Sequence, residues 1–285
     1  MVDEFGVWSR LDHERRVLMI RTENQFDLQV SLRKRLREVF LEACELHSHA
    51  MLHASAVLSP SDRRGSRTLL VVAGEERAGK TELAVQLLLR GWQLVSNDHL
   101  IAYLVDGSTR SGDPAARLVV VGMPAVISVR VDTWARLADR LPEPIDRQGV
   151  TLDEVTTLTE GQRRDSDAAV LYSYRRLGQT SPRFVTLNDN VRPVIVLARH
   201  SDHPDHVPTA ASDPVATLRT HLRTDWHAGV GFTPRYAPDL TARSAAELAT
   251  DAAALLTALA CQAPVLTWAH DGDPSPLLAY LAGGA

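Results

Sequence analysis

The chain has 285 residues, 45% of them hydrophobic and 23% charged, which is typical of a globular protein with a full apolar core. Its net charge of −4 provides no basic field for a nucleic-acid backbone, so we expect no nucleic-acid partner. Cys44 and Cys261 form no CxxC pair, the stretch 1–16 is charged, and the apolar runs are short, so we expect a reduced, cytoplasmic protein without signal peptide or membrane span.

The first hundred residues predict a strand and a helix, followed by strands on both sides of a glycine-rich loop. Leu28, Leu32 and Leu36 have the spacing of one helix face. The turn formers SPSDRRGS separate two apolar strands, and Gly91 is typical of a helix end. The predicted elements are a strand at 14–22, a helix at 29–47, strands at 51–58 and 68–73, a helix at 80–90 and a strand at 92–96.

The middle of the chain predicts a β-hairpin and then a segment without clear periodicity. Strands at 100–105 and 116–122 flank the polar run DGSTRSGDP. A strand at 125–131 continues the β series, and a short helix follows at 132–141. The segment 142–168 is acidic, contains proline and is weakly periodic, so we expect a loop or lid there.

The C-terminal part returns to the sheet. Its predicted elements are strands at 183–187 and 193–199, helices at 212–223 and 242–261, a strand at 264–269 and a closing helix at 275–281. The strands cluster in hairpins and do not alternate with helices, so we expect an α/β fold with a mixed β-sheet, many antiparallel strands and flanking helices. We expect residues 1–50 to form a strand-helix segment that packs on a P-loop domain at 51–285.

Residues 74–81, GEERAGKT, have the spacing of a P-loop and lie between a predicted strand and a predicted helix. In such a loop, backbone N–H groups surround phosphates, the lysine reaches the outer phosphates and the hydroxyl contacts Mg²⁺. Of the 31 lysines and arginines only Lys34 and Lys80 are lysine, and Lys80 lies where a compact ammonium is needed. The predicted nucleotide-binding residues are Gly74, Glu75, Glu76, Arg77, Ala78, Gly79, Lys80, Thr81 and Glu82.

Asn97 and Asp98 directly follow the strand predicted at 92–96. A carboxylate at the end of a strand beside the P-loop suits a Mg²⁺ ligand or a catalytic base in phosphoryl transfer. Taken alone, the pair is also compatible with an Asx turn. With the P-loop in place, we predict that Thr81 and Asp98 bind Mg²⁺.

The stretch from LHASAVL through GEERAGKTELAVQLLLRGWQLVSND resembles the HPr kinase/phosphorylase family, whose P-loop domain resembles that of phosphoenolpyruvate carboxykinase. The family has a strand that opens with histidine, a loop ending GKS before glutamate, a helix ending Arg-Gly and two consecutive acidic residues. The counterparts here are His53, Gly79-Lys80-Thr81-Glu82, Arg90-Gly91 and Asn97-Asp98. The resemblance covers residues 51–106 and implies a P-loop kinase fold, ATP or GTP as nucleotide, Mg²⁺ and a homo-oligomer.

Two positions depart from the family pattern. The first acidic residue, which serves the family as catalytic base, is Asn97 here, and an amide cannot take a proton. LVVVGMPAVISV occupies the place of the family's signature strand but lacks its Glu-x-Arg-Gly residues. Val119 occupies the position of the family's acid and Val121 that of its arginine. These departures argue against HPr as the substrate and leave Asp98 or His53 to accept a proton. A loose transition state would tolerate the loss of the base.

The resemblance also suggests a cation for the transferred phosphate. Arg192, before the strand PVIVLAR, matches loosely the region of a family arginine with that role, and Arg183 is the alternative.

Other polar and aromatic residues are predicted to be structural. The spacing of His47, His49 and His53 does not present all three to one zinc ion. We expect HSDHPDH at 200–206 to be a solvated loop, and Trp92 and Trp134 to pack in the core or at its rim.

We therefore expect an ATP-dependent kinase that transfers the γ-phosphoryl group to a hydroxyl of a small metabolite or of a serine or threonine in a peptide or protein. Stand-alone relatives of the family act in peptide and natural-product biosynthesis, which fits the lost signature strand. The alternative is a nucleotide-binding regulatory or assembly protein without turnover.

Overall fold

The structure is a computed structural model of the chain. It describes residues 7–12, 14–23, 25–105, 117–123, 126–179, 184–188, 190–205, 207–223 and 243–283. Among these residues, no helix has both the length and the apolar character that crossing a membrane requires.

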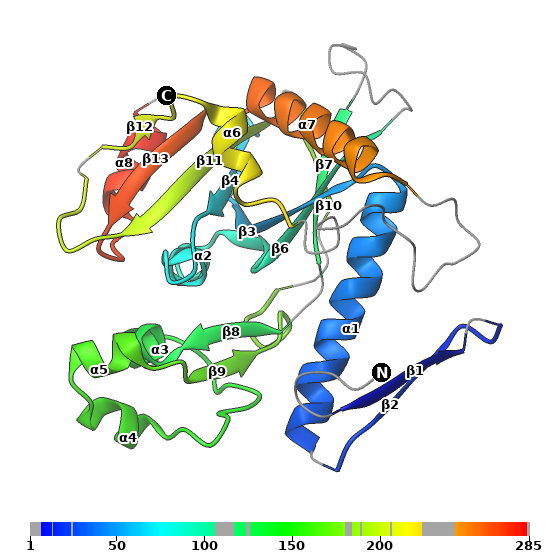
Figure 1. The fold of residues 1–285 in the computed structure, drawn as a ribbon. Helices are drawn as coiled ribbons and strands as arrows, with labels where there is room; N and C mark the ends of the chain where they lie inside the picture. Colours follow the sequence, from blue (N-terminus) through cyan, green and yellow to red (C-terminus); the bar gives the residue numbers. More distant parts are fainter. Residues whose placement is uncertain are drawn as a thin grey trace.

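A large mixed β-sheet forms the centre of the fold (Figure 1). Within the described residues it has nine strands, in the order β10-β7-β6-β3-β4-β11-β13-β12, with β5 paired to β3. The strands are β3 (Ala50–Leu58), β4 (Arg67–Ala73), β5 (Gln93–Ser96), β6 (His99–Val105), β7 (Arg117–Gly122), β10 (Phe184–Thr186), β11 (Val191–His200), β12 (Thr209–Ala210) and β13 (Val265–His270).

The central strands β4, β11 and β13 are parallel, and the other strand pairs of this sheet are antiparallel. The predicted mixed sheet with many antiparallel strands is therefore confirmed. The expected hairpin between β6 and β7 is antiparallel as well, but its connection at 106–116 lies outside the described residues.

Both faces of the central strands are buried. Along β4, Leu70 and Val72 point into one hydrophobic cluster, while Leu69 and Val71 point into the other. This alternation follows from the two-residue period of a strand, and each fully buried side chain of this kind contributes about 1.5–3 kcal/mol. The helices α2 (Lys80–Leu88) and α8 (Ser275–Ala282) cover the first face, and α6 (Pro214–Arg219) and α7 (Ala245–Gln262) cover the second (Figure 1).

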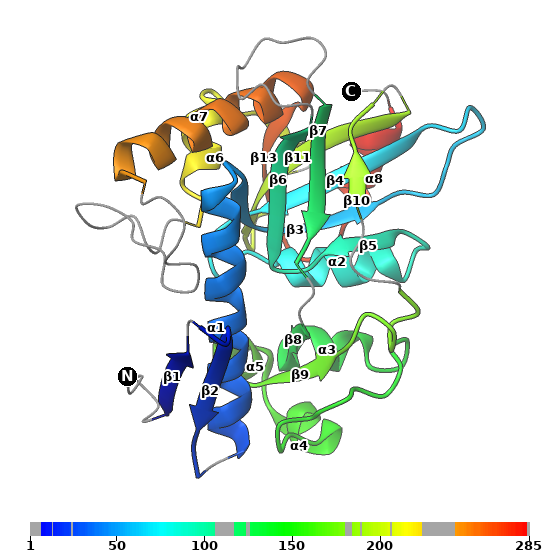
Figure 2. The same cartoon turned by 90° about the vertical axis from the view of Figure 1, so that its right-hand side faces the viewer.

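Residues 127–172 form a small lobe beneath α2 (Figure 2). Its two strands pair with each other and not with the large sheet, so the strand predicted at 125–131 is present but belongs to a separate two-stranded sheet. The lobe shares its core with the sheet, because Ile127 and Val129 belong to the same cluster as Leu83 of α2. Its elements are β8 (Ile127–Arg130), α3 (Val131–Leu137), α4 (Leu152–Thr157), α5 (Glu160–Asp165) and β9 (Ala169–Tyr172).

The segment 142–168, for which we predicted a loop or lid, contains the helices α4 and α5. Each begins with a capping box: Thr151 with Glu154 for α4, and Thr159 with Gln162 for α5. These caps satisfy N-terminal backbone groups of helices too short to show a clear apolar period.

The N-terminal residues form the hairpin β1 (Trp8–Asp12) and β2 (Val17–Arg21) and the long helix α1 (Gln25–Leu46). The C-terminal half of α1 reaches the sheet, where Leu41 and Cys44 pack with Met51 and Val121. Val121, which stands where the family resemblance would put an arginine, is thus a core residue.

The last residue of β7 passes closely over β5. A Cβ atom on Gly122 would lie 1.8 Å from the carbonyl oxygen of Val95, well inside any normal contact distance. Glycine is therefore required here because two backbones meet.

We predict that Gly122→Ala lowers the free energy of unfolding by about 3 kcal/mol, because the added methyl group forces β5 and β7 apart. Urea denaturation followed by circular dichroism measures this change. The control is Gly161→Ala in α5, where nothing lies within 4 Å of the added Cβ and the substitution should be neutral or slightly stabilising. Equal stability of Gly122→Ala and the wild type would contradict the close approach.

Candidate functional site

The glycine-rich loop connects β4 to α2 at the edge of the sheet where β4, β11 and β13 end. Two of its glycines allow close backbone approaches. A Cβ on Gly74 would lie 2.5 Å from the carbonyl oxygen of Ala198, and one on Gly79 would lie 2.5 Å from the ring of His270. Gly79 also has a φ of 80°, in the region that favours glycine. At these two positions only glycine fits between the loop and the ends of β11 and β13.

His270, the last residue of β13, supports the loop from beneath. Its ring is fully buried, its Nε2 lies 2.9 Å from the carbonyl oxygen of Ala78, and its Nδ1 accepts a hydrogen bond from the backbone N–H of Gly272 at 3.0 Å. Because Nδ1 is an acceptor, Nε2 carries the proton and donates to Ala78. Burial lowers the pKa of His270, which keeps the ring neutral. No local sequence pattern marks this residue, since it lies about 190 positions from the loop.

Lys80 begins α2 and is largely buried. Its Nζ donates hydrogen bonds to the carbonyl oxygens of Gly74 and Glu75, both at 2.8 Å. Burial lowers the pKa of Lys80, and the nearby carboxylate of Asp98 partly offsets that effect. The ammonium is thus held within the loop close to a carboxylate.

Asn97 and Asp98 form an irregularity between β5 and β6, which pair with the same edge of β3 one after the other. Ala54 donates its backbone N–H to the carbonyl oxygen of Asp98 at 3.1 Å, and Ser55 Oγ donates to the carbonyl oxygen of Asn97. Asp98 lines the cavity beside the loop. Asn97 is buried, does not line that cavity, and its Oδ1 has no hydrogen-bond partner among the described residues.

This placement corrects the prediction that Asn97 stands in the position of a catalytic base. Both residues lie in the bend between β5 and β6, and of the two only Asp98 lines the cavity. Asp98 has the cavity side.

Two histidines hold the carboxylate of Asp98. His53 Nε2 lies 3.1 Å from Oδ1, and His99 Nδ1 lies 2.8 Å from Oδ2. Burial by itself would raise the pKa of Asp98, but the adjacent rings of His53 and His99 outweigh it and hold the pKa well below its usual range. Asp98 is therefore an ionised carboxylate, and the two predicted site residues His53 and Asp98 lie in contact.

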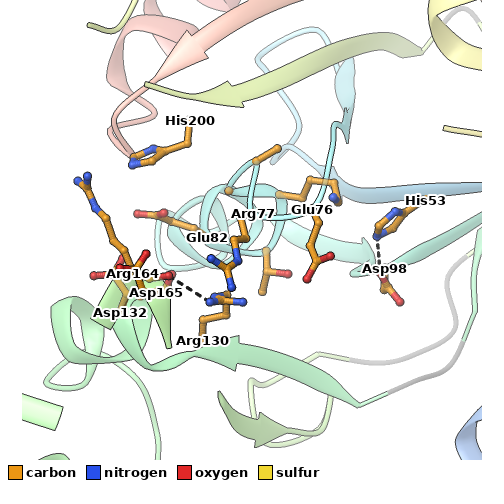
Figure 3. Close-up of a pocket in the computed structure, with 15 residues that line it drawn as sticks. His53, Glu76, Arg77, Glu82, Asp98, Arg130, Asp132, Arg164, Asp165 and His200 are labelled. Carbon is orange, nitrogen blue, oxygen red and sulfur yellow. Dashed lines mark hydrogen bonds and ion pairs between the residues drawn. The ribbon is translucent and has the colours of Figure 1, made fainter. Parts of the chain in front are cut away.

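A cavity of about 340 Å³ separates the loop from the small lobe (Figure 3). Residues 76–82 line one side and His53 and Asp98 line one end. The other side comes from the small lobe and the end of β11, through Arg130, Asp132, Thr133, Arg164, Asp165 and His200. The cavity thus brings the P-loop together with charged residues from a different part of the chain.

Among the described residues, three ion pairs connect the small lobe to the rest of the molecule around this cavity. Arg136 of α3 pairs with Glu82 of α2, which is only 8% exposed in its side chain. Arg77 pairs with Asp167 at 2.9 Å, and Arg164 pairs with Asp202 at 3.1 Å. Glu82, predicted as a nucleotide-binding residue, therefore also anchors the small lobe to α2.

Arg192 lies far from the loop, which contradicts its predicted contact with a transferred phosphate. It is the second residue of β11 and pairs in register with Thr68, at the start of β4. The loop begins after the other end of β4, so about six residues, or roughly 20 Å of strand, separate the two. The alternative, Arg183, lies outside the described residues.

Besides Lys80, the arginines Arg77, Arg130 and Arg164 line the cavity. Arg130 and Arg164 were not predicted, because no local motif marks them and only the folding of the small lobe brings them to the loop. His221 was also not predicted. Its carbonyl oxygen accepts the backbone N–H of His53 at 2.8 Å, and burial lowers the pKa of its buried ring.

The remaining candidates have structural surroundings. His49 stacks on Tyr103 with ring centroids 4.6 Å apart. In the part of the chain that the structure describes, no group of three or more His, Cys, Asp or Glu side chains is arranged to hold a metal ion. Trp92 and Trp134 both belong to the buried core.

The segment 200–206, predicted as a solvated loop, is more closely tied to the fold. His200 is the last residue of β11 and lines the cavity, and the carbonyl oxygen of Asp205 accepts a hydrogen bond from Trp268 Nε1 at 3.0 Å. His206 lies outside the described residues.

We predict that the neutral ring of His270 makes the fold sensitive to mild acid. The unfolded side chain titrates near pH 6.5, and the folded pKa is lower. Below pH 6.5 the unfolded chain binds more protons, so the free energy of unfolding falls as the pH decreases toward the folded pKa.

His270→Gln should cost about 2–3 kcal/mol at pH 7.5, through lost packing and hydrogen bonds, and should show a shallower loss of stability between pH 6.5 and 5. Urea denaturation at several pH values measures both effects. His203→Gln, on an exposed site, is the control. An unchanged pH slope in His270→Gln would contradict the assignment.

Comparison of the sequence with protein-family models and with curated proteins gives no match. The features of this chain that indicate a function are therefore the loop, the carboxylate beside it and the cavity that they share.

Proposed function

We propose that this protein is an ATP-dependent kinase of the HPr kinase/phosphoenolpyruvate carboxykinase-like type, which transfers the γ-phosphoryl group to a hydroxyl. One observation carries the proposal: Lys80, Thr81 and the ionised carboxylate of Asp98 line a single cavity. Phosphoryl transfer needs a cation at the outer phosphates, oxygen ligands for a divalent metal and a held acceptor. This cavity provides the first two.

The shape of the loop fits a nucleotide phosphate. The absence of side chains at Gly74 and Gly79 lets the backbone fold tightly against Ala198 and His270 at the N-terminus of α2. Free N–H groups of a helix N-terminus and the helix dipole both favour an anion at this place. Lys80, held by two loop carbonyl groups, adds a full positive charge.

Mg²⁺ fits the residues present. The Thr81 hydroxyl and the Asp98 carboxylate are hard oxygen donors on the same cavity, and Mg²⁺ in kinases is commonly held by one or two protein oxygens together with the phosphates. When bound, Mg²⁺ would neutralise charge on the transferred phosphate. The depressed pKa of Asp98 keeps this carboxylate charged at neutral pH.

The proton of the acceptor hydroxyl would pass to Asp98 or His53, which face the cavity where Asn97 does not. In a loose transition state the proton leaves late, so a weak base is sufficient and positioning dominates. The charged lining of the cavity suits a polar acceptor, such as a small metabolite or a serine or threonine of a peptide. A role in natural-product or peptide biosynthesis is consistent with this acceptor class.

The alternative function is a nucleotide-binding regulatory or assembly protein. The observation that favours it is the single carboxylate at the end of β5, because the neighbouring position holds a buried amide. Binding without transfer would then be the whole activity.

We predict that Lys80→Ala lowers the affinity for Mg·ATP by about 10–100-fold, the loss expected for one charged hydrogen-bond donor to phosphate. Isothermal titration calorimetry measures it. The matched control is Lys34→Ala, which changes the other lysine of the chain, on α1. If both variants bind like the wild type, the P-loop assignment is wrong.

We further predict that ADP formation rises when a suitable hydroxyl acceptor is added and disappears in Lys80→Ala and Asp98→Asn. Coupled ADP detection across a panel of hydroxyl compounds and Ser/Thr peptides measures this. Tight ATP binding with no transfer to any acceptor would favour the regulatory function. Asn97→Asp should not raise transfer and should cost about 1–3 kcal/mol of stability, because it places a carboxylate in a buried site.

A further inference from the structure

Arg77 has an unusual backbone for an arginine. Its φ is 64°, in the left-handed region that side chains with a Cβ disfavour and glycine adopts freely. A glycine here would relieve the backbone, yet the loop presents a long cationic side chain. Strain of this kind at a binding loop points to a function for the side chain.

The guanidinium of Arg77 extends from the loop toward the small lobe and meets a second arginine there (Figure 3). Arg77 lies 2.9 Å from Asp167 Oδ1, and Arg130 lies 3.4 Å from the same oxygen. Two positive charges therefore share one carboxylate, and one positive charge remains uncompensated within this trio. Arg130 is fixed from behind by the carbonyl oxygens of Arg164 and Ser166.

Asp167 is a weak competitor for these arginines. Its side chain is 83% exposed, so water solvates the carboxylate well when it is released. Exposed ion pairs of this type contribute little to stability. The firmer connection between α2 and the small lobe is the pair of Arg136 with buried Glu82. Other residues thus already hold the small lobe in place.

We propose that Arg77 and Arg130 together bind the terminal phosphate of ATP, in competition with the carboxylate of Asp167. This inference rests on the proposed function, because it places the phosphates on the loop that contains Lys80. Both guanidiniums line the same cavity as Lys80 and Thr81. A phosphate with about two negative charges attracts a guanidinium pair more strongly than a single exposed carboxylate does. The small lobe thereby contributes a cation that distinguishes ATP from ADP.

The test measures the dissociation constants of Mg·ATP and Mg·ADP by calorimetry for the wild type and four variants. Arg77→Gly and Arg130→Ala should weaken ATP binding by about 10–100-fold, because the terminal phosphate loses a charged partner. The dissociation constant of Mg·ADP should change by no more than about 3-fold, because ADP lacks that phosphate. Asp167→Asn should strengthen ATP binding relative to ADP by about 3–10-fold, because it removes the competing charge. The control Arg140→Ala changes an exposed arginine of the small lobe outside the cavity and should alter neither constant.

Arg77→Gly and Asp167→Asn are expected to change ATP affinity in opposite directions, which separates ligand binding from a structural ion pair. If Asp167→Asn weakens ATP binding as Arg77→Gly does, the pair is structural and the proposal is overturned. An unchanged ATP-to-ADP ratio in Arg77→Gly also overturns it. Arg77→Gly tests the proposal even if Arg130→Ala does not fold, because glycine suits the left-handed backbone at position 77. Melting curves check that Arg77→Gly is folded.

The outcome for Lys80→Ala distinguishes failure of the role of the two arginines from failure of the proposed function. If nucleotide binding depends on Lys80 but the ratio of ATP to ADP affinity is unchanged in the arginine variants, only the role of Arg77 and Arg130 is overturned. A wild type that binds neither nucleotide overturns this role and the proposed function together.

Discussion

The burial of both faces of β4 and β11 is the constraint on which the rest of the structure depends. Strands with apolar side chains on both sides need covers on both sides, and α2 with the small lobe provides one while α6 and α7 provide the other. Such a sandwich leaves only the ends of the strands open to a ligand. The loop at residues 74–79 lies at that open edge, supported by Ala198 and His270 at the ends of β11 and β13.

Charge is distributed around the cavity in an ordered way. Asp98 lies at one end, beside His53 and His99, and its carboxylate is close enough to Lys80 to act against the lowering of the lysine pKa by burial. The guanidiniums of Arg77 and Arg130 lie on the side of the small lobe. A carboxylate at one end and guanidiniums at one side therefore face one volume, which is the arrangement on which the proposed binding of a metal-bound polyphosphate rests.

The sequence predicts the centre of this fold better than its surroundings. The strand, loop and helix around Lys80 combine a local motif with clear apolar periods, and their boundaries agree closely with β4 and α2. Of the small lobe, the sequence predicts β8 and α3 but not α4, α5 and β9, which are too short for a periodic signal. Arg192 was misplaced for a different reason: the pattern identifies β11 as a strand, but only its parallel register with β4 shows which end lies near the loop. His270 and Arg130 depend on contacts between distant segments, which no local pattern contains.

The hydrogen bonds of Lys80 have a consequence for how the loop would meet a ligand. Its ammonium already donates to the carbonyl oxygens of Gly74 and Glu75, so the loop keeps its curvature through its own side chain. A ligand oxygen would exchange these bonds and not simply add to them. The enthalpy gained at this position is then smaller than a count of contacts suggests, while the entropy lost in ordering the loop is small as well. The loop is in this sense preorganised, because its own lysine fixes its shape.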